Sequence, residues 1–242
     1  MSSIEFHNVT KRFDNGLEAL QGVSTHFESG SMTFLTGHSG AGKSTFLKLL
    51  LRLDQPTRGQ ILVNGVNIVQ LAERKLPAYR QHLGAVFQDH NLLANRTVFE
   101  NVATPLQVNG MRERDIGRRV RAALSRVGLL EKENLYPRYL STGEQQRIGI
   151  ARAVVNRPKI LLADEPTGNL DPELSRDIME LFLQFVQVGT TVLVASHDRE
   201  LIKAMGLRIL ELSHGRLVSA QEPHELPAAE PLVATAESDD AI

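Results

Sequence analysis

The chain has 242 residues and a formal net charge of -1, with 27 basic and 28 acidic side chains. A hydrophobic share of 42% is enough for one globular domain with a full core. The balanced charge argues against a general attraction to nucleic acid or to an anionic membrane. The lack of cysteine excludes disulfides and thiolate metal sites.

Alternating apolar residues at the start of the chain predict two short strands, Ile4–Val9 and Val23–Phe27, joined by a turn near Asp14–Gly16. A compact apolar strand is expected at Met32–Thr36. A helix should run from Ser44 to about Arg52, because apolar residues recur there at helical spacing. Further strands are expected at Gln60–Val63 and Leu83–Phe87.

After Gln88 the pattern becomes mostly helical. The expected helices are Thr97–Leu106, Arg112–Val127 and Ser141–Asn156. Two buried strands then follow, Ile160–Ala163 and Thr191–Ala195, with a helix at Pro172–Val188 between them. Helices that alternate with continuously apolar strands predict an α/β sheet covered on both faces.

This pattern divides the chain into a core, an insert and a tail. We expect residues 1–88 and 157–219 to form the core and residues 89–156 to form a helical lobe. Residues 220–242 are rich in Ala, Glu and Pro and lack periodicity, which is typical of a mobile tail. The apolar runs fall short of the roughly 20 residues that cross a bilayer, and no secretory signal is visible. We therefore expect no direct membrane insertion, so that any membrane role depends on a partner.

The segment GHSGAGKST matches the phosphate-binding pattern G-x-x-x-x-G-K-[ST] and stands between a strand and a helix. Its glycines allow backbone N–H groups to converge, and the helix adds its positive end. Lys43 can reach the β and γ phosphates, and the Ser44 hydroxyl can ligate Mg²⁺. The alternative is an incidental glycine-rich turn, which the full spacing disfavours. The predicted nucleotide-binding residues are Gly37, His38, Ser39, Gly40, Ala41, Gly42, Lys43, Ser44 and Thr45.

Two adjacent acids, Asp164 and Glu165, follow the apolar strand in KILLADEPTGNLD. Because successive side chains of a strand point to opposite faces, the two acids are not expected to share one role. We assign Asp164 to the water shell of Mg²⁺ and Glu165 to orienting and deprotonating the attacking water. The alternative is a strand end with solvated acids, which the phosphate loop disfavours.

Together these motifs resemble the ABC ATPases. The most specific one is LSTGEQQRIGIARAV at Leu140–Val154, which is similar to the family signature. Gln88 in VFQD resembles the Q-loop, Asn169–Asp171 the D-loop, and His197 in ASHD the switch histidine. Phe13 stands where the family usually places an aromatic residue that stacks on adenine.

The resemblance implies a P-loop NTPase of the ABC type, with a RecA-like core sheet, an N-terminal antiparallel β subdomain and an inserted helical subdomain. It also implies a head-to-tail homodimer that hydrolyses ATP with Mg²⁺. The implied catalytic residues are Lys43, Gln88, Glu165 and His197, and the implied metal ligands are Ser44, Gln88 and Asp164. The second subunit would bring Ser141, Gly143 and Glu144 to the nucleotide.

Within the family, the phrases LTGHSGAGKST and LLADEPTGNLD resemble most closely the ATPases that serve bacterial cell division. That resemblance implies an integral membrane partner, contacts with division-ring proteins and a peripheral place on the cytoplasmic face of the inner membrane. The ATPase subunits of lipoprotein-releasing and macrolide exporters are the nearest alternative. A soluble ABC protein that acts on DNA or ribosomes is another, but a single cassette without basic arms argues against a nucleic-acid partner.

The signature also has a purely local interpretation. Ser141 and Glu144 have the spacing of a capping box, in which the serine caps a helix and contributes about 1 kcal/mol. A capped helix start is compatible with an anion site. Thr142 stands where the family usually has Gly; at a first helical position its φ is ordinary, so we expect a modest effect on dimer closure. The arginines among residues 112–126 alternate with acids, which is typical of a solvated helix face.

Overall fold

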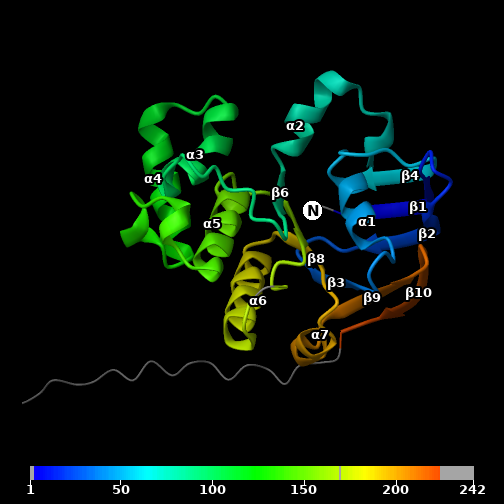
Figure 1. Cartoon of the computed structure of the whole chain (residues 1–242). Coiled ribbons are helices and arrows are strands. Elements are labelled where there is room, and N and C mark those ends of the chain that lie inside the picture. The colour runs from blue at the N-terminus through cyan, green and yellow to red at the C-terminus, as the bar shows by residue number, and fades with distance from the viewer. Residues whose placement is uncertain (1–2, 169, 224–242) are drawn as a thin grey trace, which may run out of the picture.

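Two sheets form one part of the molecule, and helices between residues 98 and 154 form the other (Figure 1). The computed structural model describes residues 3–168 and 170–223. Asn169 and residues 224–242, which carry part of the expected D-loop and most of the expected tail, lie outside the described residues.

The N-terminal sheet is antiparallel and has the strand order β2-β1-β4-β5. Its strands are β1 (Ile4–Arg12), β2 (Glu18–Phe27), β4 (Arg58–Val63) and β5 (Val66–Asn67). Phe6 of β1 stacks on Phe46 of helix α1 (Lys43–Leu50), with ring centroids 4.0 Å apart. The sheet is therefore anchored to the helix that follows the phosphate loop.

The central sheet has the order β10-β9-β3-β8-β7-β6, and β10 is its antiparallel strand. Its strands are β3 (Met32–Thr36), β6 (Leu83–Val86), β7 (Ile160–Asp164), β8 (Thr191–Ala195), β9 (Arg208–Ser213) and β10 (Arg216–Gln221). Along β7, Leu161 belongs to the apolar cluster on the side of helix α6 (Pro172–Gln187), whereas Leu162 belongs to the cluster around α1. Both faces of the sheet are thus covered, as the continuous apolar strands predict.

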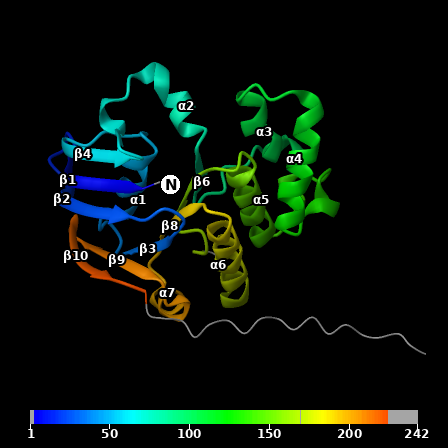
Figure 2. The same cartoon turned by 180° about the vertical axis from the view of Figure 1, so that it is seen from behind.

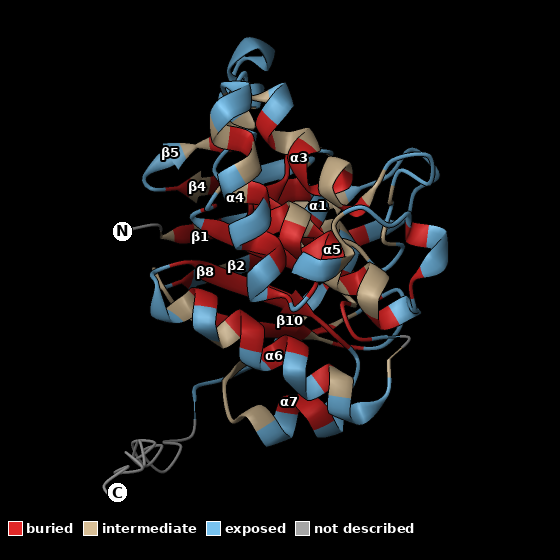
Figure 3. Cartoon of the chain, turned by 90° about the vertical axis from the view of Figure 1, so that its left-hand side faces the viewer, coloured by how far each residue is buried: buried red, intermediate tan, exposed pale blue. Residues whose placement is uncertain are grey.

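The helical part consists of α3 (Val98–Val108), α4 (Glu113–Arg126) and α5 (Thr142–Val154). Viewed from behind, α6 lies between these helices and the strands (Figure 2). A buried cluster joins residues of the helices to residues of β3, β7 and β8, and buried and exposed residues alternate along α6 (Figure 3). The division into core and helical subdomain at residues 89–156 stays a prediction.

Several elements were not predicted from the sequence. They are helices α2 (Leu76–Arg80) and α7 (Arg199–Met205), strands β5, β9 and β10, and the 3-10 turns Ile68–Gln70, Glu73–Lys75, Leu130–Lys132 and Pro137–Tyr139. The expected tail start at Ala220 was wrong, because Ala220 and Gln221 pair with β9 as part of β10. Among the described residues, no helix is both long enough and apolar enough to cross a membrane.

Candidate nucleotide site

A cavity of about 620 Å³ lies at the edge where the parallel strands end. The phosphate loop follows β3, Gln88 follows β6, Glu165 follows β7 and His197 follows β8. Carboxyl ends of parallel strands are the usual place for ligands in open α/β sheets. The lining residues are Phe13, Leu17, Ala19, His38, Ser39, Gly40, Ala41, Gly42, Lys43, Ser44, Thr45, Gln88, Glu165 and His197.

The phosphate loop needs glycine at two of its positions. Gly37 has a φ of 146° and Gly42 a φ of 110°, both in the region that favours glycine. A Cβ on Gly37 would lie 2.2 Å from the Leu212 carbonyl oxygen, and one on Gly42 would lie 2.4 Å from the Ala19 carbonyl oxygen. The loop is therefore pressed between β9 and β2, and this contact fixes its shape.

Lys43 is the first residue of α1, directly after the loop glycines, and is 8% exposed. Its Nζ donates to the Gly37 carbonyl oxygen at 2.8 Å and lies 3.6 Å from Oε1 of Glu165. Helix α1 begins at the same place, and no side chain caps its first turn because the N-cap is Gly42. A buried cation and an uncapped helix start therefore favour a phosphate group here.

Glu165 connects Lys43 to His197. Its Oε2 lies 2.9 Å from Nδ1 of His197, while Oε1 faces Lys43. The backbone of Glu165 is left-handed, with φ at 48°, and its N–H donates to the Ala195 carbonyl oxygen at 2.9 Å. A non-glycine residue in this region costs about 1–3 kcal/mol and is held by its surroundings. The residue is thus fixed against the ends of β7 and β8.

The expected reason for separating the two acids was wrong. Strand alternation does not apply, because β7 ends at Asp164 and Glu165 already has a left-handed backbone. The turn of the main chain, rather than the pleat, gives the two carboxylates their different surroundings.

Asp164 is placed to accept a cation. Burial raises the pKa of its carboxyl group, while a hydrogen bond from Ser44 acts in the opposite direction. Its Oδ1 is buried and has no hydrogen-bond partner among the described residues. An unpaired carboxylate oxygen beside a hydroxyl fits Mg²⁺, which prefers oxygen ligands and takes one or two carboxylates together with substrate phosphates.

Gln88 and Phe13 both line the cavity. Phe13 is 36% exposed, and Nζ of Lys11 lies 4.9 Å from its ring centroid. Leu17 and Ala19 also line the cavity, and the sequence interpretation missed both. The signal was weak, because an apolar Leu17 beside the turn at Gly16 has no fixed spacing to the phosphate loop.

The signature segment does not line this cavity. Ser141 is the N-cap of α5: its Oγ accepts from the Glu144 N–H at 3.3 Å, and Glu144 Oε2 accepts from the Ser141 N–H at 2.9 Å. The predicted capping box is confirmed, and Thr142 begins the helix without a positive φ. The other oxygen of Glu144 pairs with Lys132, which the sequence did not indicate.

Gly143 lies against the first turn of α6. A Cβ on Gly143 would be 2.1 Å from Cδ2 of Leu174. The Leu174 N–H in turn donates to Oδ1 of Asp171, the N-cap of α6, at 3.0 Å. The first turn of α6, which follows the expected D-loop, therefore packs against Gly143 of the same chain.

The family model described as "ABC transporter" matches residues 20–168. The cell division ATP-binding protein FtsE of Escherichia coli (strain K12) is 54% identical over 214 residues, which cover 88% of this chain and 96% of that protein. The chain belongs to the ABC transporter family. FtsE of Mycobacterium tuberculosis (strain ATCC 25618 / H37Rv) is 48% identical over 220 residues, which cover 90% of this chain and 96% of that protein.

Solved structures agree with this family. A dimeric bacterial ABC transporter cassette has a TM-score of 0.84 and 34% identity, and the match covers 92% of this chain and all of that one. A dimeric post-hydrolysis cassette bound to ADP and Pi has the same TM-score at 33% identity. The expected ABC fold is confirmed, and the chain is an ATP-binding and ATP-hydrolysing ABC cassette. The roles of its individual site residues stay predictions.

Proposed function

We propose that this chain is the ATP-hydrolysing subunit of an FtsE–FtsX membrane complex. In this complex, nucleotide-driven closure of two copies would signal across the inner membrane in cell division and septal wall hydrolysis. The proposal is supported by 54% identity over nearly the full length of an FtsE protein.

The observation that carries the chemical part is the placement of Glu165 between Lys43 and His197. Lys43 offsets the charge of the β and γ phosphates, and Glu165 accepts the proton of the attacking water. His197 orients the Glu165 carboxylate and contacts the γ phosphate. Phe13 stacks on the adenine.

Ser44, Asp164 and Gln88 are the proposed ligands of Mg²⁺. The metal would neutralise charge on the β and γ phosphates. The unpaired Oδ1 of Asp164 supports this assignment, because a buried carboxylate oxygen without a hydrogen-bond donor has a high desolvation cost.

A second copy completes the proposed site. Ser141 and Thr142 are exposed and lie outside the nucleotide cavity of their own chain. In a head-to-tail homodimer, Ser141, Gly143 and Glu144 would bring an N-terminal helix end to the γ phosphate held by the other copy. The dimeric assembly of similar cassettes supports this arrangement.

The proposed membrane partner is FtsX, and division-ring proteins are further partners. A cytoplasmic helix of FtsX would dock beside Gln88 and the helices α3–α5, which places the chain on the cytoplasmic face of the inner membrane. Closing and opening of the dimer can act on FtsX only if the two nucleotide states contact that helix differently.

Depletion of the protein in its source cell tests the biological part. We expect filaments with unseparated septa, rescued by the native gene and not by Glu165→Gln. Co-purification from native membranes should recover FtsX. Mislocalised lipoproteins together with recovery of a lipoprotein-releasing membrane subunit would contradict the proposal and favour the exporter alternative.

A further inference from the structure

A second hollow, which we call the basic pocket, lies at the other edge of the central sheet. It has a volume of about 570 Å³. Lys159 stands just before β7 and Thr190 just before β8, so the pocket opens where the parallel strands begin and the nucleotide cavity where they end. The lining residues are Arg119, Ala122, Ala123, Arg126, Val154, Val155, Arg157, Pro158, Lys159, Phe185, Val188, Gly189 and Thr190.

Four cations line the basic pocket: Arg119, Arg126, Arg157 and Lys159. No acidic side chain lines it, and none of the four cations has an ion pair within residues 3–168 and 170–223. By contrast, Arg121 on the same helix pairs with Glu133 at 2.9 Å. The expected solvated arginine face is therefore divided, because two of its arginines face a shared hollow.

The floor of the basic pocket is apolar. Val154, Val155 and Phe185 belong to the large buried cluster and reach the pocket at its base. Val188 stands at the rim and is 68% exposed. An apolar floor beneath unpaired cations fits an occupant that carries both negative charges and apolar side chains.

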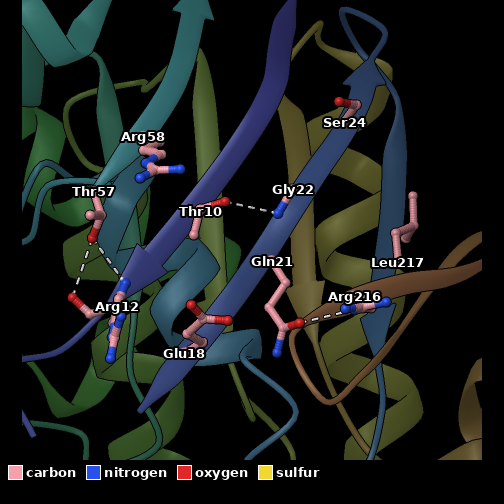
Figure 4. A pocket seen from close by; sticks show the side chains of 10 residues that line it. All are labelled: Thr10, Arg12, Glu18, Gln21, Gly22, Ser24, Thr57, Arg58, Arg216 and Leu217. Atoms are coloured by element: carbon pink, nitrogen blue, oxygen red, sulfur yellow. Dashed lines mark hydrogen bonds between the residues drawn. The ribbon is translucent and has the colours of Figure 1, made fainter. Parts of the chain in front are cut away.

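A third hollow, of about 700 Å³, is also lined by arginines (Figure 4). It differs from the basic pocket in the pairing of its charges and in the polarity of its walls. Glu18 lies among its arginines, and Nε of Arg216 already donates to Oε1 of Gln21 at 2.9 Å. Its walls are mostly polar side chains of β1 and β2. The basic pocket thus pairs unneutralised charge with apolar surface, and the hollow in Figure 4 does not.

The sequence contains a segment of matching chemistry. Residues 224–242 hold five acids, Glu225, Glu230, Glu237, Asp239 and Asp240, and no lysine or arginine. The preceding residues therefore carry all 27 basic side chains against 23 acidic ones. Apolar residues, among them Leu226, Leu232 and Val233, stand between the acids.

Residues 224–242 also start at the same edge of the central sheet as the basic pocket. Gln221 pairs with Ile209 while the chain runs antiparallel to β9, and Oε1 of Glu222 lies 3.2 Å from Nε of Arg208, the first residue of β9. The chain thus leaves β10 toward the edge where the parallel strands begin. From β10 to β7 there are four strand spacings, about 19 Å at roughly 4.8 Å each. A segment of 19 residues extends up to about 60 Å, so the basic pocket is within its reach.

We propose that residues 224–242 bind in the basic pocket of their own chain. Their carboxylates pair with Arg119, Arg126, Arg157 and Lys159, and their apolar side chains cover the floor around Phe185 and Val188. Because α4 and α5 form one wall and α6 with the start of β7 the other, the bound segment bridges the helices and the central sheet. The proposal does not depend on the proposed role in cell division.

Crosslinking in the full chain tests the proposal, because the chain contains no cysteine of its own. Val188→Cys and Val233→Cys are combined, and the two thiols are joined with a short bismaleimide. We expect a crosslink within one chain at low salt. Its yield should fall several-fold in 1 M salt, where the screening length drops from about 10 Å at 0.1 M to about 3 Å. Mapping of the linked peptides measures the yield.

Two variants separate pairing from simple proximity. Neutralising the five acids of residues 224–242 to Gln or Asn alters no residue of the described fold and should abolish the crosslink. The exchange Arg126→Glu with Lys159→Glu should do the same. Arg112→Glu with Arg114→Glu is the matched control, because these arginines lie on the same segment outside the pocket, and it should leave the yield unchanged.

Three results would overturn the proposal. The first is a yield that neither salt nor neutralisation changes. The second is an equal yield when Val108→Cys, an exposed valine outside the pocket, replaces Val188→Cys. The third is a crosslink that forms only between isotopically distinct copies, which would make a second chain the occupant.

Discussion

The phosphate-loop side and the signature side of the chain both present the start of a helix. They differ in whether a side chain caps the free backbone N–H groups of the first turn. Helix α1 begins after Gly42 without a side-chain cap and has the buried Lys43 in its first turn. Helix α5 begins with Ser141, whose capping box is closed by Glu144 of the same chain. The first side leaves a helix start and a buried cation open to an anion, whereas the helix start on the second side is already capped within its own chain. Substitutions should therefore affect chemistry on the first side and assembly on the second.

The largest effect is expected on the first side, for Glu165→Gln. The amide cannot take a proton from water, and general-base catalysis is commonly worth about 10²–10⁴-fold in rate. ATP binding should persist, so the variant should accumulate as an ATP-bound dimer. Steady-state phosphate release and light scattering during size exclusion measure the two outcomes. Hydrolysis at the parental rate would show that Glu165 is not the base.

Lys43→Ala should act on binding. Its ammonium is the buried cation of the loop, and a hydrogen bond to a charged group contributes about 1.5–3 kcal/mol. ATP affinity should therefore fall by about tenfold to a hundredfold. Isothermal calorimetry with Mg²⁺ measures this change, and Lys48→Ala, on the same helix but outside the cavity, is the control. Unchanged affinity would contradict the assignment.

On the second side, Ser141→Ala should have two separable effects. Loss of the cap should lower the free energy of unfolding by about 1 kcal/mol. Turnover should also fall, by about tenfold for a lost hydrogen bond to phosphate. Thr97→Ala is the matched control, because Thr97 and Glu100 form the same capping box on α3 outside the cavity. Thr97→Ala should lose a similar free energy of unfolding and keep the parental turnover. If Ser141→Ala also keeps the parental turnover, Ser141 is a helix cap and has no role at the phosphate.

The smallest effect concerns pH. The hydrogen bond from Lys132, followed by that from the Ser141 backbone, holds the pKa of Glu144 below its ordinary value of 4.5. A lowered pKa in the folded state contributes stability above pH 4.5, which is lost as the pH falls through the folded value. The stability difference between the parent and Glu144→Gln should therefore be constant near neutral pH and shrink in acid. Chemical denaturation between pH 3 and 7 measures it, and a difference independent of pH would contradict the assignment.

The sequence predicted the elements whose signal is local. The apolar strand Ile160–Ala163 and the capping box of Ser141 were both found, because a continuous apolar run and a helix cap are each visible within a few residues. The hairpin of β9 and β10 was missed. Leu210 and Leu212 alternate there as buried residues, and the positive φ of His214 and Gly215 forms its turn. His-Gly is a weaker hairpin signal than Asn-Gly or Asp-Gly, so the sequence did not predict this turn.

The site was predictable as a set of residues but not as an arrangement. The glycine pattern and the acids identify the segments, yet the contact of Glu165 with both Lys43 and His197 depends on three strand ends meeting. The left-handed backbone of Glu165 has no sequence signature, because an acid in that conformation is held by its tertiary surroundings. The wall formed by Leu17 and Ala19 was missed for a similar reason: its place depends on how β2 lies against the loop.

The contact between Gly143 and Leu174 has a consequence for a two-site machine. In the proposed sandwich, the start of α5 serves the neighbour's nucleotide, whereas the segment leading from Glu165 to α6 belongs to the chain's own. One packed contact inside a single subunit therefore joins the two reaction centres mechanically. An added Cβ at residue 143 would require the Leu174 side chain to shift, so the two helices pack closely at this point. If the proposed dimer forms, this contact lies on the shortest route within one subunit between the two nucleotide sites.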